Sequence, residues 1–275
     1  MLKTRVLTAA VLLAVLLSAL FLLPRNGWIA FCALLLGIAA WEWGALAGLA
    51  AAGRSIYTAF VIGLFVLPEV LEVSRADGLY VPIWIYCAAA LFWIILVPLW
   101  MWRRPQMDGR ALLLTAGAIA LVPAFAAAVD LRSVRPSLLV AVLATVWISD
   151  SAAYLVGRRF GKRKLAPFIS PGKTWEGVAG ALAAVALYAL AWASLSGPAG
   201  LSLGPGRAQL GPVWILPVLL GLAVAGMIGD LLESLIKRQA GVKDSGALLP
   251  GHGGVLDRID APLAMLPLAA LAFVR

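Results

Sequence analysis

The sequence predicts an all-α, polytopic integral membrane protein that crosses the bilayer in about nine transmembrane helices. Hydrophobic residues make up 63% of the 275 residues, whereas an ordinary soluble domain contains roughly 45–50%. Charged residues make up only 13%, against about 25% in a typical soluble domain. A compact soluble fold of this size cannot hide so much apolar surface from water, so we expect lipid around it. Disorder is excluded as well, because disordered chains are polar and highly charged.

Nine apolar stretches qualify as candidate spans, because about 20 apolar residues cross about 30 Å of hydrocarbon. They are Val6–Leu23, Trp28–Ala50, Ile56–Val73, Val81–Trp102, Ala111–Leu131, Ser137–Val156, Val178–Leu195, Val213–Leu232 and Pro262–Val274. Pro68, Glu69 and Glu72 weaken the third stretch, and the ninth stretch is short. The stretches do not alternate polar and apolar residues with a period of two, which argues against a β-barrel.

The basic residues favour one orientation of these spans. With a cytoplasmic N-terminus, 16 of the 22 lysines and arginines fall on the cytoplasmic side. Those residues are Lys3, Arg5, Arg54, Arg103, Arg104, Arg110, Arg158, Arg159, Lys162, Arg163, Lys164, Lys173, Lys237, Arg238, Lys243 and Arg258, and the other side holds Arg25, Arg75, Arg132, Arg135, Arg207 and Arg275. We also expect the inner membrane of a bacterium, with the N-terminus cytoplasmic. The net charge of +9 then reflects anionic lipids or an anionic substrate, and no nucleic acid is expected.

The chain is expected to be a single membrane domain, residues 1–275, with an uneven distribution of charge. Residues 1–136 hold the N-terminal helices and are expected to act as a scaffold. Residues 137–275 hold the C-terminal helices and the two longest polar connections, Gly157–Gly177 and Glu233–Ala261. Both connections fall on the cytoplasmic side in this orientation, so we expect the chemistry there.

The connection between the eighth and ninth spans is the densest mixture of acidic, basic and glycine residues. If the eighth span continues as a helix, Asp230, Glu233 and Lys237 share one face by their i, i+3 and i+4 spacing. Asp257 and Asp260 also share a face where the ninth helix begins. Carboxylates on two helix ends suit Mg²⁺, which takes oxygen ligands and leaves room for substrate phosphates. Nearby lysines and arginines are suited to bind phosphate oxygens.

The connection between the sixth and seventh spans carries a second polar cluster. It contains Gly-Lys-Thr ending at Thr174, which resembles the end of a phosphate-binding P-loop, but Pro167 stands where that motif needs glycine. No strand is expected before it either, so we reject a P-loop. We expect Ser170, Lys173 and Thr174 at the start of the seventh helix, where backbone N–H groups form a natural anion site. Asp150, near the inner end of the sixth span, belongs with this cluster.

These two segments resemble the phosphatidate cytidylyltransferases, also called CDP-diglyceride synthases. From Ser234 to Asp260 the chain has S-x-x-K-R, K-D-x-G, P-G-H-G-G and D-R-x-D in that order, as in the signature of the family. From Asp150 to Gly177 it has D-x-x-A-Y-x-x-G, F-G and S-P-x-K-T-x-E-G, which is similar to the family's other motif. The resemblance implies a multi-helix membrane enzyme that converts CTP and phosphatidic acid into CDP-diacylglycerol and pyrophosphate with Mg²⁺.

The resemblance also implies roles for individual residues. Metal ligands are expected at Asp230 and Asp257, and phosphate-binding residues at Lys237, Arg238 and Lys173. Our full prediction has Asp230, Asp257 and Asp260 as metal ligands, Lys237, Arg238, Asp244 and Lys173 as catalytic residues, and Asp150, Ser170, Lys173, Thr174, Lys243, His252 and Arg258 as substrate-binding residues. The expected partners are CTP, phosphatidic acid and membrane lipids. The sequence does not decide whether a second cation binds or whether the protein forms a homodimer.

Two other functions were weighed against this one. An anion transporter with a basic inner vestibule would distribute charge through both leaflets or repeat broken helices, whereas here the charge gathers on one side. A CDP-alcohol phosphotransferase would carry D-G-x-x-A-R followed by spaced aspartates, and the Asp-Gly pairs at Asp77 and Asp108 lack the rest.

Glu42 is an ionisable residue near the middle of the second span, between Trp41 and Trp43. A charge there is costly, so both a functional role and a structural pairing inside the bundle are expectations. The sequence does not choose between them. Acyl-chain preference, the choice between CTP and dCTP and the number of metal ions also stay open.

Overall fold

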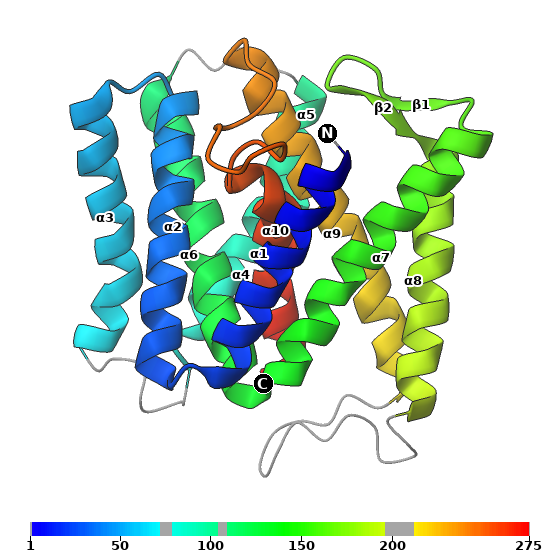
Figure 1. Ribbon diagram of the computed structural model, residues 1–275, viewed down its shortest axis with the longest axis horizontal. Coiled ribbons are helices and arrows are strands. Elements are labelled where there is room, and N and C mark those ends of the chain that lie inside the picture. The colour runs from blue at the N-terminus through cyan, green and yellow to red at the C-terminus, as the bar shows by residue number, and fades with distance from the viewer. Residues whose placement is uncertain (1, 72–78, 104–108, 196–211, 275) are drawn as a thin grey trace.

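The computed structural model describes residues 2–71, 79–103, 109–195 and 212–274, which form a bundle of helices with one small hairpin (Figure 1). The elements are α1 (Leu2–Leu22), α2 (Arg25–Leu46), α3 (Ala51–Val70), α4 (Ile83–Leu91), the π-helical turn η1 (Phe92–Leu96), α5 (Val97–Arg103), α6 (Arg110–Val134), α7 (Pro136–Phe160), β1 (Lys164–Ala166), β2 (Ser170–Thr174), α8 (Trp175–Leu195), α9 (Pro212–Gln239) and α10 (Leu256–Phe273). Glu72, Asp77, Arg75, Arg104, Asp108, Arg207 and Arg275, used in the sequence argument, lie outside the described residues.

Within the described residues, seven helical segments are long and apolar enough to cross a membrane. They are α2, α3, the continuous run α4–η1–α5, α6, α7, α8 and α9, which correspond to the second to eighth predicted stretches. The apolar part of α1, Val6–Leu22, is shorter, and α10 carries charged residues in its first turns. The protein is therefore an all-α membrane protein, as its composition predicts.

The centre of the bundle is formed by α6 and α10. α10 contacts α4, α6 and α9 and lies in the middle of the view in Figure 1. The apolar stretch of α6 is 72% buried, whereas those of α3 and α8 are each only 17% buried. The outer helices expose large apolar side chains such as Phe60 and Leu187. Surfaces of this kind are stable against lipid but would be an aggregation hazard in water.

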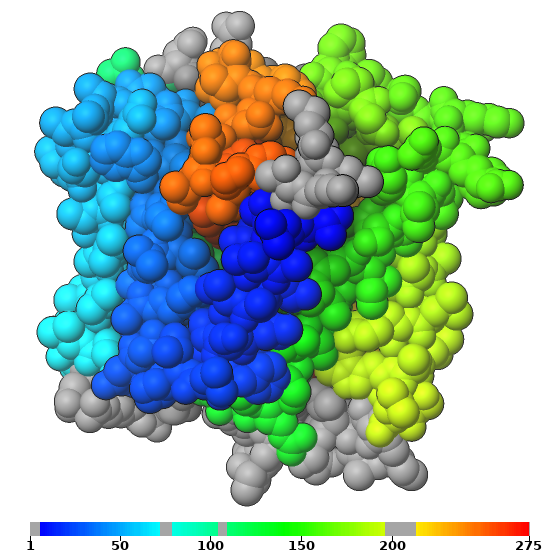
Figure 2. All heavy atoms as spheres, in the orientation of Figure 1, coloured from blue at the N-terminus to red at the C-terminus, as the bar shows by residue number. Residues whose placement is uncertain are grey.

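The polar segments gather at one end of the bundle. The β1–β2 hairpin and the segment between α9 and α10 lie at the end that also holds the N-terminus, and the C-terminus lies at the opposite end (Figure 1). In Figure 2 the segment between α9 and α10 (orange) rests against α1 and α2 (blue). Thr8 on α1 donates a hydrogen bond to the Pro250 carbonyl oxygen at 3.3 Å. Elements far apart in the sequence therefore meet where the charges are.

The expectation of a helix start at Ser170 and Lys173 is wrong. These residues lie on β2, which pairs antiparallel with β1, and α8 begins only after β2 ends. Thr174, the last residue of β2, accepts a hydrogen bond from the Gly177 N–H at 3.1 Å and so caps the first turn of α8. Pro171 and its glycine neighbour are poor helix formers, and β1 offers their strand a partner. The helix therefore starts only after Thr174, and Ser170 and Lys173 do not belong to its first turn.

The two helix ends predicted to carry the acidic residues are confirmed. α9 continues as a helix through Gln239, so Asp230, Glu233 and Lys237 lie on its last turns. α10 begins before its apolar stretch, and Asp257 lies in its first turn. These acidic and basic residues therefore lie on helices and not in the loop between them, because both helices extend beyond their apolar stretches.

Candidate active site

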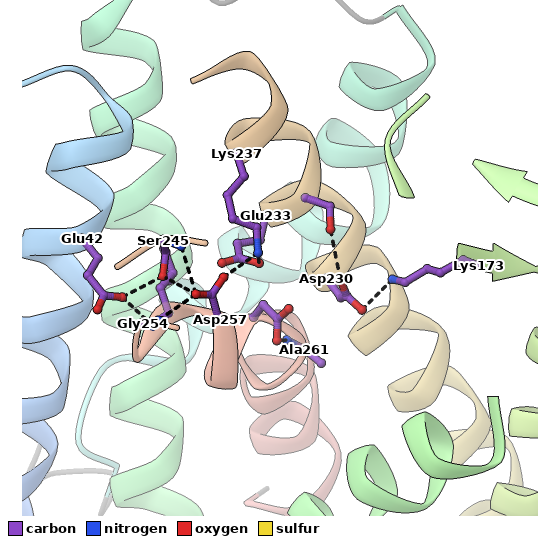
Figure 3. Close-up of polar contacts among 12 residues, drawn as sticks. Glu42, Lys173, Asp230, Glu233, Lys237, Ser245, Gly254, Asp257 and Ala261 are labelled. Atoms are coloured by element: carbon purple, nitrogen blue, oxygen red, sulfur yellow. Dashed lines mark hydrogen bonds and ion pairs between the residues drawn. The ribbon is translucent and has the colours of Figure 1, made fainter. Parts of the chain in front are cut away.

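Lys237 lies between two carboxylates at the end of α9 (Figure 3). Its Nζ is 2.6 Å from Glu233 Oε2, one turn earlier on α9, and 2.6 Å from Asp257 Oδ1 on α10. The three side chains expose only 13%, 3% and 4% of their surface, respectively. Removing one partner of such a buried group leaves an uncompensated charge, which is strongly destabilising. The cluster therefore joins the ends of α9 and α10 and fixes the relative position of their charges.

The second oxygen of Asp257 accepts hydrogen bonds from the loop before α10. Oδ2 lies 3.0 Å from the Ser245 N, 3.1 Å from the Ser245 Oγ and 2.8 Å from the Gly254 N. Asp257 precedes the apolar stretch of α10. Burial raises its pKa, but the hydrogen bonds from Lys237, Gly254 and Ser245 outweigh burial and leave the pKa below its ordinary value. Asp257 is therefore held as a carboxylate with both oxygens engaged.

The glycines of the P-G-H-G-G turn are needed for this arrangement. Gly253 has a φ of 81°, a left-handed conformation that side chains disfavour, and a Cβ there would lie 2.5 Å from Asp257 Oδ2. Gly254 has no room for a Cβ either, because that atom would clash with Ser245 Oγ and Glu42 Oε2. The backbone can approach the carboxylates only because these positions lack side chains.

Glu42 on α2 holds the same loop from the other side. Its Oε1 accepts the Val255 N–H at 3.0 Å, and its Oε2 accepts the Leu256 N–H at 2.8 Å and the Ser245 hydroxyl at 2.9 Å. Glu42 is 5% exposed and Ser245 is 7% exposed. Of the two interpretations left open by the sequence, pairing inside the protein is the observed one, and the partners belong to the polar loop.

A second ion pair lies beside a cavity between α7, the β1–β2 hairpin, α8 and α9. Lys173 Nζ on β2 is 2.6 Å from Asp230 Oδ2 on α9 (Figure 3). The cavity has a volume of about 490 Å³, and Asp150, Ser170, Lys173, Thr174 and Asp230 are among its lining residues. Five of the predicted site residues, taken from three separate parts of the sequence, therefore share one cavity.

Close packing brings the carboxylates of α9 and α10 near each other. A Cβ on Gly229 would clash with the Asp260 carbonyl oxygen, and one on Gly226 would lie 3.4 Å from the Ala261 Cβ. The helices thus touch along a line of small residues directly beside Asp230. The side chain of Asp260 accepts the Ala261 N–H at 2.9 Å. The three predicted metal ligands lie on neighbouring turns of these two helices.

The other residues of the predicted site take no part in the ion pairs and hydrogen bonds described above. Arg238, Lys243 and Asp244 are exposed and form no ion pair with any described residue. His252 is half-buried in the glycine-rich turn, and among the described residues its Nδ1 has no hydrogen-bond partner. Arg258 lines a different cavity, of about 140 Å³, which α1, α2, α6, α7 and α10 surround. The structure thus separates a buried centre from an exposed basic rim.

The cytidylyltransferase family matches residues 3–274, which is nearly the whole chain. This chain belongs to the cytidylyltransferase family. A phosphatidate cytidylyltransferase of Pseudomonas aeruginosa is 40% identical over 98% of this chain and 96% of its own length. A phosphatidate cytidylyltransferase of Haemophilus influenzae is 35% identical over 97% of this chain and 96% of its own. One from Brucella suis is 48% identical over 135 residues, which cover 48% of this chain and 45% of that protein. The protein is therefore a nucleotidyltransferase, as the two motifs indicate.

The donor chemistry of the cytidylyltransferase site suits a divalent cation. Asp230, Asp257 and Asp260 offer oxygen atoms, the ligands that Mg²⁺ prefers. In the described part of the chain, however, no three acidic, histidine or cysteine side chains are grouped so as to hold a metal ion, and lysines pair with two of these carboxylates.

Three residues of this site were absent from our predicted set. Glu233 had a signal, since the sequence places it on the same helix face as Asp230 and Lys237. Glu42 stands out in the sequence as a costly charge within a span. Its hydrogen-bond partners, however, lie more than 200 residues away, and Ser245 follows it by 203 residues. Ser245 occupies the variable position of K-D-x-G, so nothing in the sequence indicates a role for it. Side-chain pairing across the fold was the missing information.

Proposed function

We propose that this cytidylyltransferase transfers the cytidylyl group of CTP to phosphatidate, giving CDP-diacylglycerol and pyrophosphate for phospholipid synthesis. The observation that carries the proposal is the whole-length similarity to a protein named phosphatidate cytidylyltransferase, 40% identical over 98% of this chain. The site supports it, because both substrates are anionic and the charged clusters lie at one end of a membrane bundle. A lipid substrate never has to leave the bilayer to reach such a site.

The reaction needs no base to create its nucleophile. A phosphatidate phosphate oxygen is already ionised near neutral pH, and it attacks the α-phosphorus of CTP. A new phosphorus–oxygen bond forms while the bond from the α-phosphorus to the α,β-bridging oxygen breaks, and the electron pair leaves with pyrophosphate. The obstacles are repulsion between two anions and charge on the leaving group, so electrostatic stabilisation and positioning supply the catalysis.

Lys173 and Lys237 are the groups that we assign to the phosphates. Each is paired with a carboxylate, at 2.6 Å, and an arriving triphosphate would compete with that carboxylate for the ammonium group. Arg238 and Lys243 on the exposed rim would attract the anions before they reach the buried centre. Catalytic assistance from Asp244 and substrate contacts from His252 and Arg258 remain part of the proposal.

Mg²⁺ at Asp230, Asp257 and Asp260 is also part of the proposal. The ion would neutralise phosphate charge when bound, and the carboxylates suit it for the reasons given above. Ser170, Thr174 and Asp150 would then contact substrate within the cavity that they line. These three carboxylates do not determine how many Mg²⁺ ions bind.

The assay uses the purified protein in detergent with labelled CTP, phosphatidic acid and Mg²⁺. We expect label in the organic phase and release of pyrophosphate, and loss of both with a chelator. Asp257→Asn, which keeps the size of the side chain, is the matched control. Label that enters the lipid phase without added phosphatidic acid, or no lipid-soluble label at all, would overturn the proposed function.

We propose nine spans, with the N-terminus and the site on the cytoplasmic side of the inner membrane. The excess of basic residues at that end supports this orientation. The test places single cysteines by Lys162→Cys and Arg135→Cys in a Cys87→Ser background, since Cys32 is buried. A membrane-impermeant reagent should label position 162 only from the cytoplasmic side and position 135 only from outside. Labelling of both positions from one side would refute this topology.

A further inference from the structure

Glu42, near the end of α2, accepts three hydrogen bonds from the segment between α9 and α10 and the start of α10. Its three hydrogen-bond donors, Ser245, Val255 and Leu256, span the whole glycine-rich segment, from its first turn to the start of α10. Both oxygens of the carboxylate are used, and the residue is only 5% exposed. A buried carboxyl group is costly unless its contacts compensate, and the contacts of Glu42, in the last turns of α2, lie around Asp257.

Ser245 connects Glu42 to Asp257. Its Oγ lies 2.9 Å from Glu42 Oε2 and 3.1 Å from Asp257 Oδ2, as the dashed lines in Figure 3 show. A hydroxyl group has one proton to donate, so Ser245 can donate to only one of the two carboxylates at a time. The backbone N–H of Ser245 also binds Asp257, at 3.0 Å. The position of this single residue therefore depends on both acidic side chains.

We propose that Glu42 is a positioning residue that fixes Asp257 through Ser245 and through the first N–H groups of α10. Glu42 does not touch the substrates in this view. It holds the loop so that one oxygen of Asp257 faces Lys237 while the other is held by the loop N–H groups. When a cation or substrate changes the partner of Asp257, the Ser245 hydroxyl can turn to Glu42, so the loop keeps a hydrogen bond in either state. The catalytic part of this inference rests on the proposed function, whereas the clamp itself does not.

The space around Glu42 supports a dedicated clamp. A Cβ at Gly246 would lie 2.6 Å from Glu42 Oε1, and one at Gly254 would clash with Glu42 Oε2. Both glycines belong to the loop, so the loop backbone is shaped around this carboxylate from two sides. A neutral apolar side chain of similar size would leave the Val255 and Leu256 N–H groups unpaired and buried, which is unfavourable.

The main test compares Glu42→Gln with the wild type. Glutamine keeps the size but replaces one acceptor oxygen by an NH₂ group, which would face an N–H or O–H donor. We expect kcat to fall about 10- to 100-fold, the range found when outer-shell partners of ligating groups are removed, while the KM values for CTP and phosphatidate change less than about 3-fold. Glu69→Gln is the matched control, because Glu69 pairs with Arg25 on an exposed surface.

A double-mutant cycle tests the route through Ser245. Ser245→Ala alone should lower kcat, and the Glu42→Gln/Ser245→Ala double variant should be little worse than Glu42→Gln, because both changes remove the same connection. If the two losses multiply, Glu42 does not act through Ser245 and the proposal is wrong. Should Glu42→Gln fail to fold, Ser245→Ala carries the test, and full kcat in a folded Ser245→Ala would refute it.

Amide hydrogen exchange gives a readout that does not depend on turnover. In folded Glu42→Gln without substrates, the Val255 and Leu256 amides should exchange at least about 10-fold faster than in the wild type, whereas the amides of the central part of α6 should be unchanged. Unchanged exchange at both loop amides would overturn the clamp. If the wild type fails to transfer cytidylyl groups but the exchange result holds, the proposed function fails and the clamp stands.

Discussion

The two ends of the helix bundle both contain buried polar networks, but the networks use different donors. At the end with the acidic loop, lysines from α9 and β2 are the cations, and a cavity of about 490 Å³ adjoins Lys173 on β2. At the opposite end, Asp130 on α6 accepts the Tyr80 N–H at 2.6 Å and the Tyr86 hydroxyl at 2.5 Å. Arg132 next to it binds the Leu20 carbonyl oxygen at 2.8 Å.

This difference separates function from stability. A lysine ammonium on a flexible chain can leave its carboxylate for a phosphate, so the first network can take part in binding. In the second network Asp130 accepts a tyrosine hydroxyl and a backbone N–H, and Arg132 binds a backbone carbonyl oxygen, so we expect this network to fasten helices. Buried ion pairs are weak evidence for stability in any case, because desolvation offsets their attraction. We therefore expect substitutions at the first end to affect turnover and those at the second end to affect unfolding.

The largest effect is expected for Asp257→Asn. Loss of the charge removes the partner of Lys237 and a proposed metal ligand, so kcat should fall at least about 100-fold, or about 2.7 kcal/mol in the activation barrier. Thermal unfolding in detergent should change less than turnover, since asparagine fills the same space and Lys237 keeps Glu233 as a partner. The measurement is turnover per folded molecule. Activity within a few-fold of the wild type would remove Asp257 from the chemistry and break the contrast between the two ends.

Lys173→Ala should have the next largest effect. It removes the cation that pairs with Asp230 beside the cavity, and we expect kcat/KM for CTP to fall about 10- to 100-fold, chiefly through KM. Lys173→Arg should retain part of the activity, because it keeps the charge. The matched control is Lys162→Ala, an exposed lysine before the hairpin, which should be nearly silent. Equal losses for Lys162 and Lys173 would mean that only the overall charge matters.

Asp130→Asn should show the opposite pattern. One acceptor becomes a donor that faces the Tyr80 N–H or the Tyr86 hydroxyl, so unfolding in detergent should become easier by about 1–3 kcal/mol. The folded fraction should keep a normal kcat. Chemical unfolding followed by tryptophan fluorescence measures the first quantity and the lipid assay the second. A large fall in kcat without loss of stability would show that the two ends are coupled.

His252→Gln should have the smallest effect of the set. The phosphatidate oxygen needs no base, so this change should cost less than Lys237→Ala or Arg238→Ala, which remove positive charge. The check compares the turnover of the three variants and the wild type between about pH 6 and 9, which covers the ordinary titration range of histidine. If His252→Gln is the most damaged variant, and the wild-type rate follows a histidine titration, the mechanism without a base is wrong.

Several parts of the fold were accessible from the sequence because their signals are local. Asp230, Glu233 and Lys237 were placed on one helix face on the condition that the eighth span continues as a helix, and α9 does continue to Gln239. The β1–β2 hairpin was missed because three- and five-residue strands are stable only with a partner, and pairing is not visible in a short window. The cavity beside Lys173 was missed for a related reason, since its walls come from five elements.

The sequence by itself determined that this is an all-α membrane protein of the cytidylyltransferase type, with its polar residues in two segments. Apolar run lengths and motif spacings carry that information, because each depends on residues close together in the chain. Only the tertiary structure decided that Lys173 pairs with Asp230, that Lys237 lies between Glu233 and Asp257, and that Glu42 holds the loop. A buried charge is stable only with a partner, and which partner it meets depends on how distant helices pack.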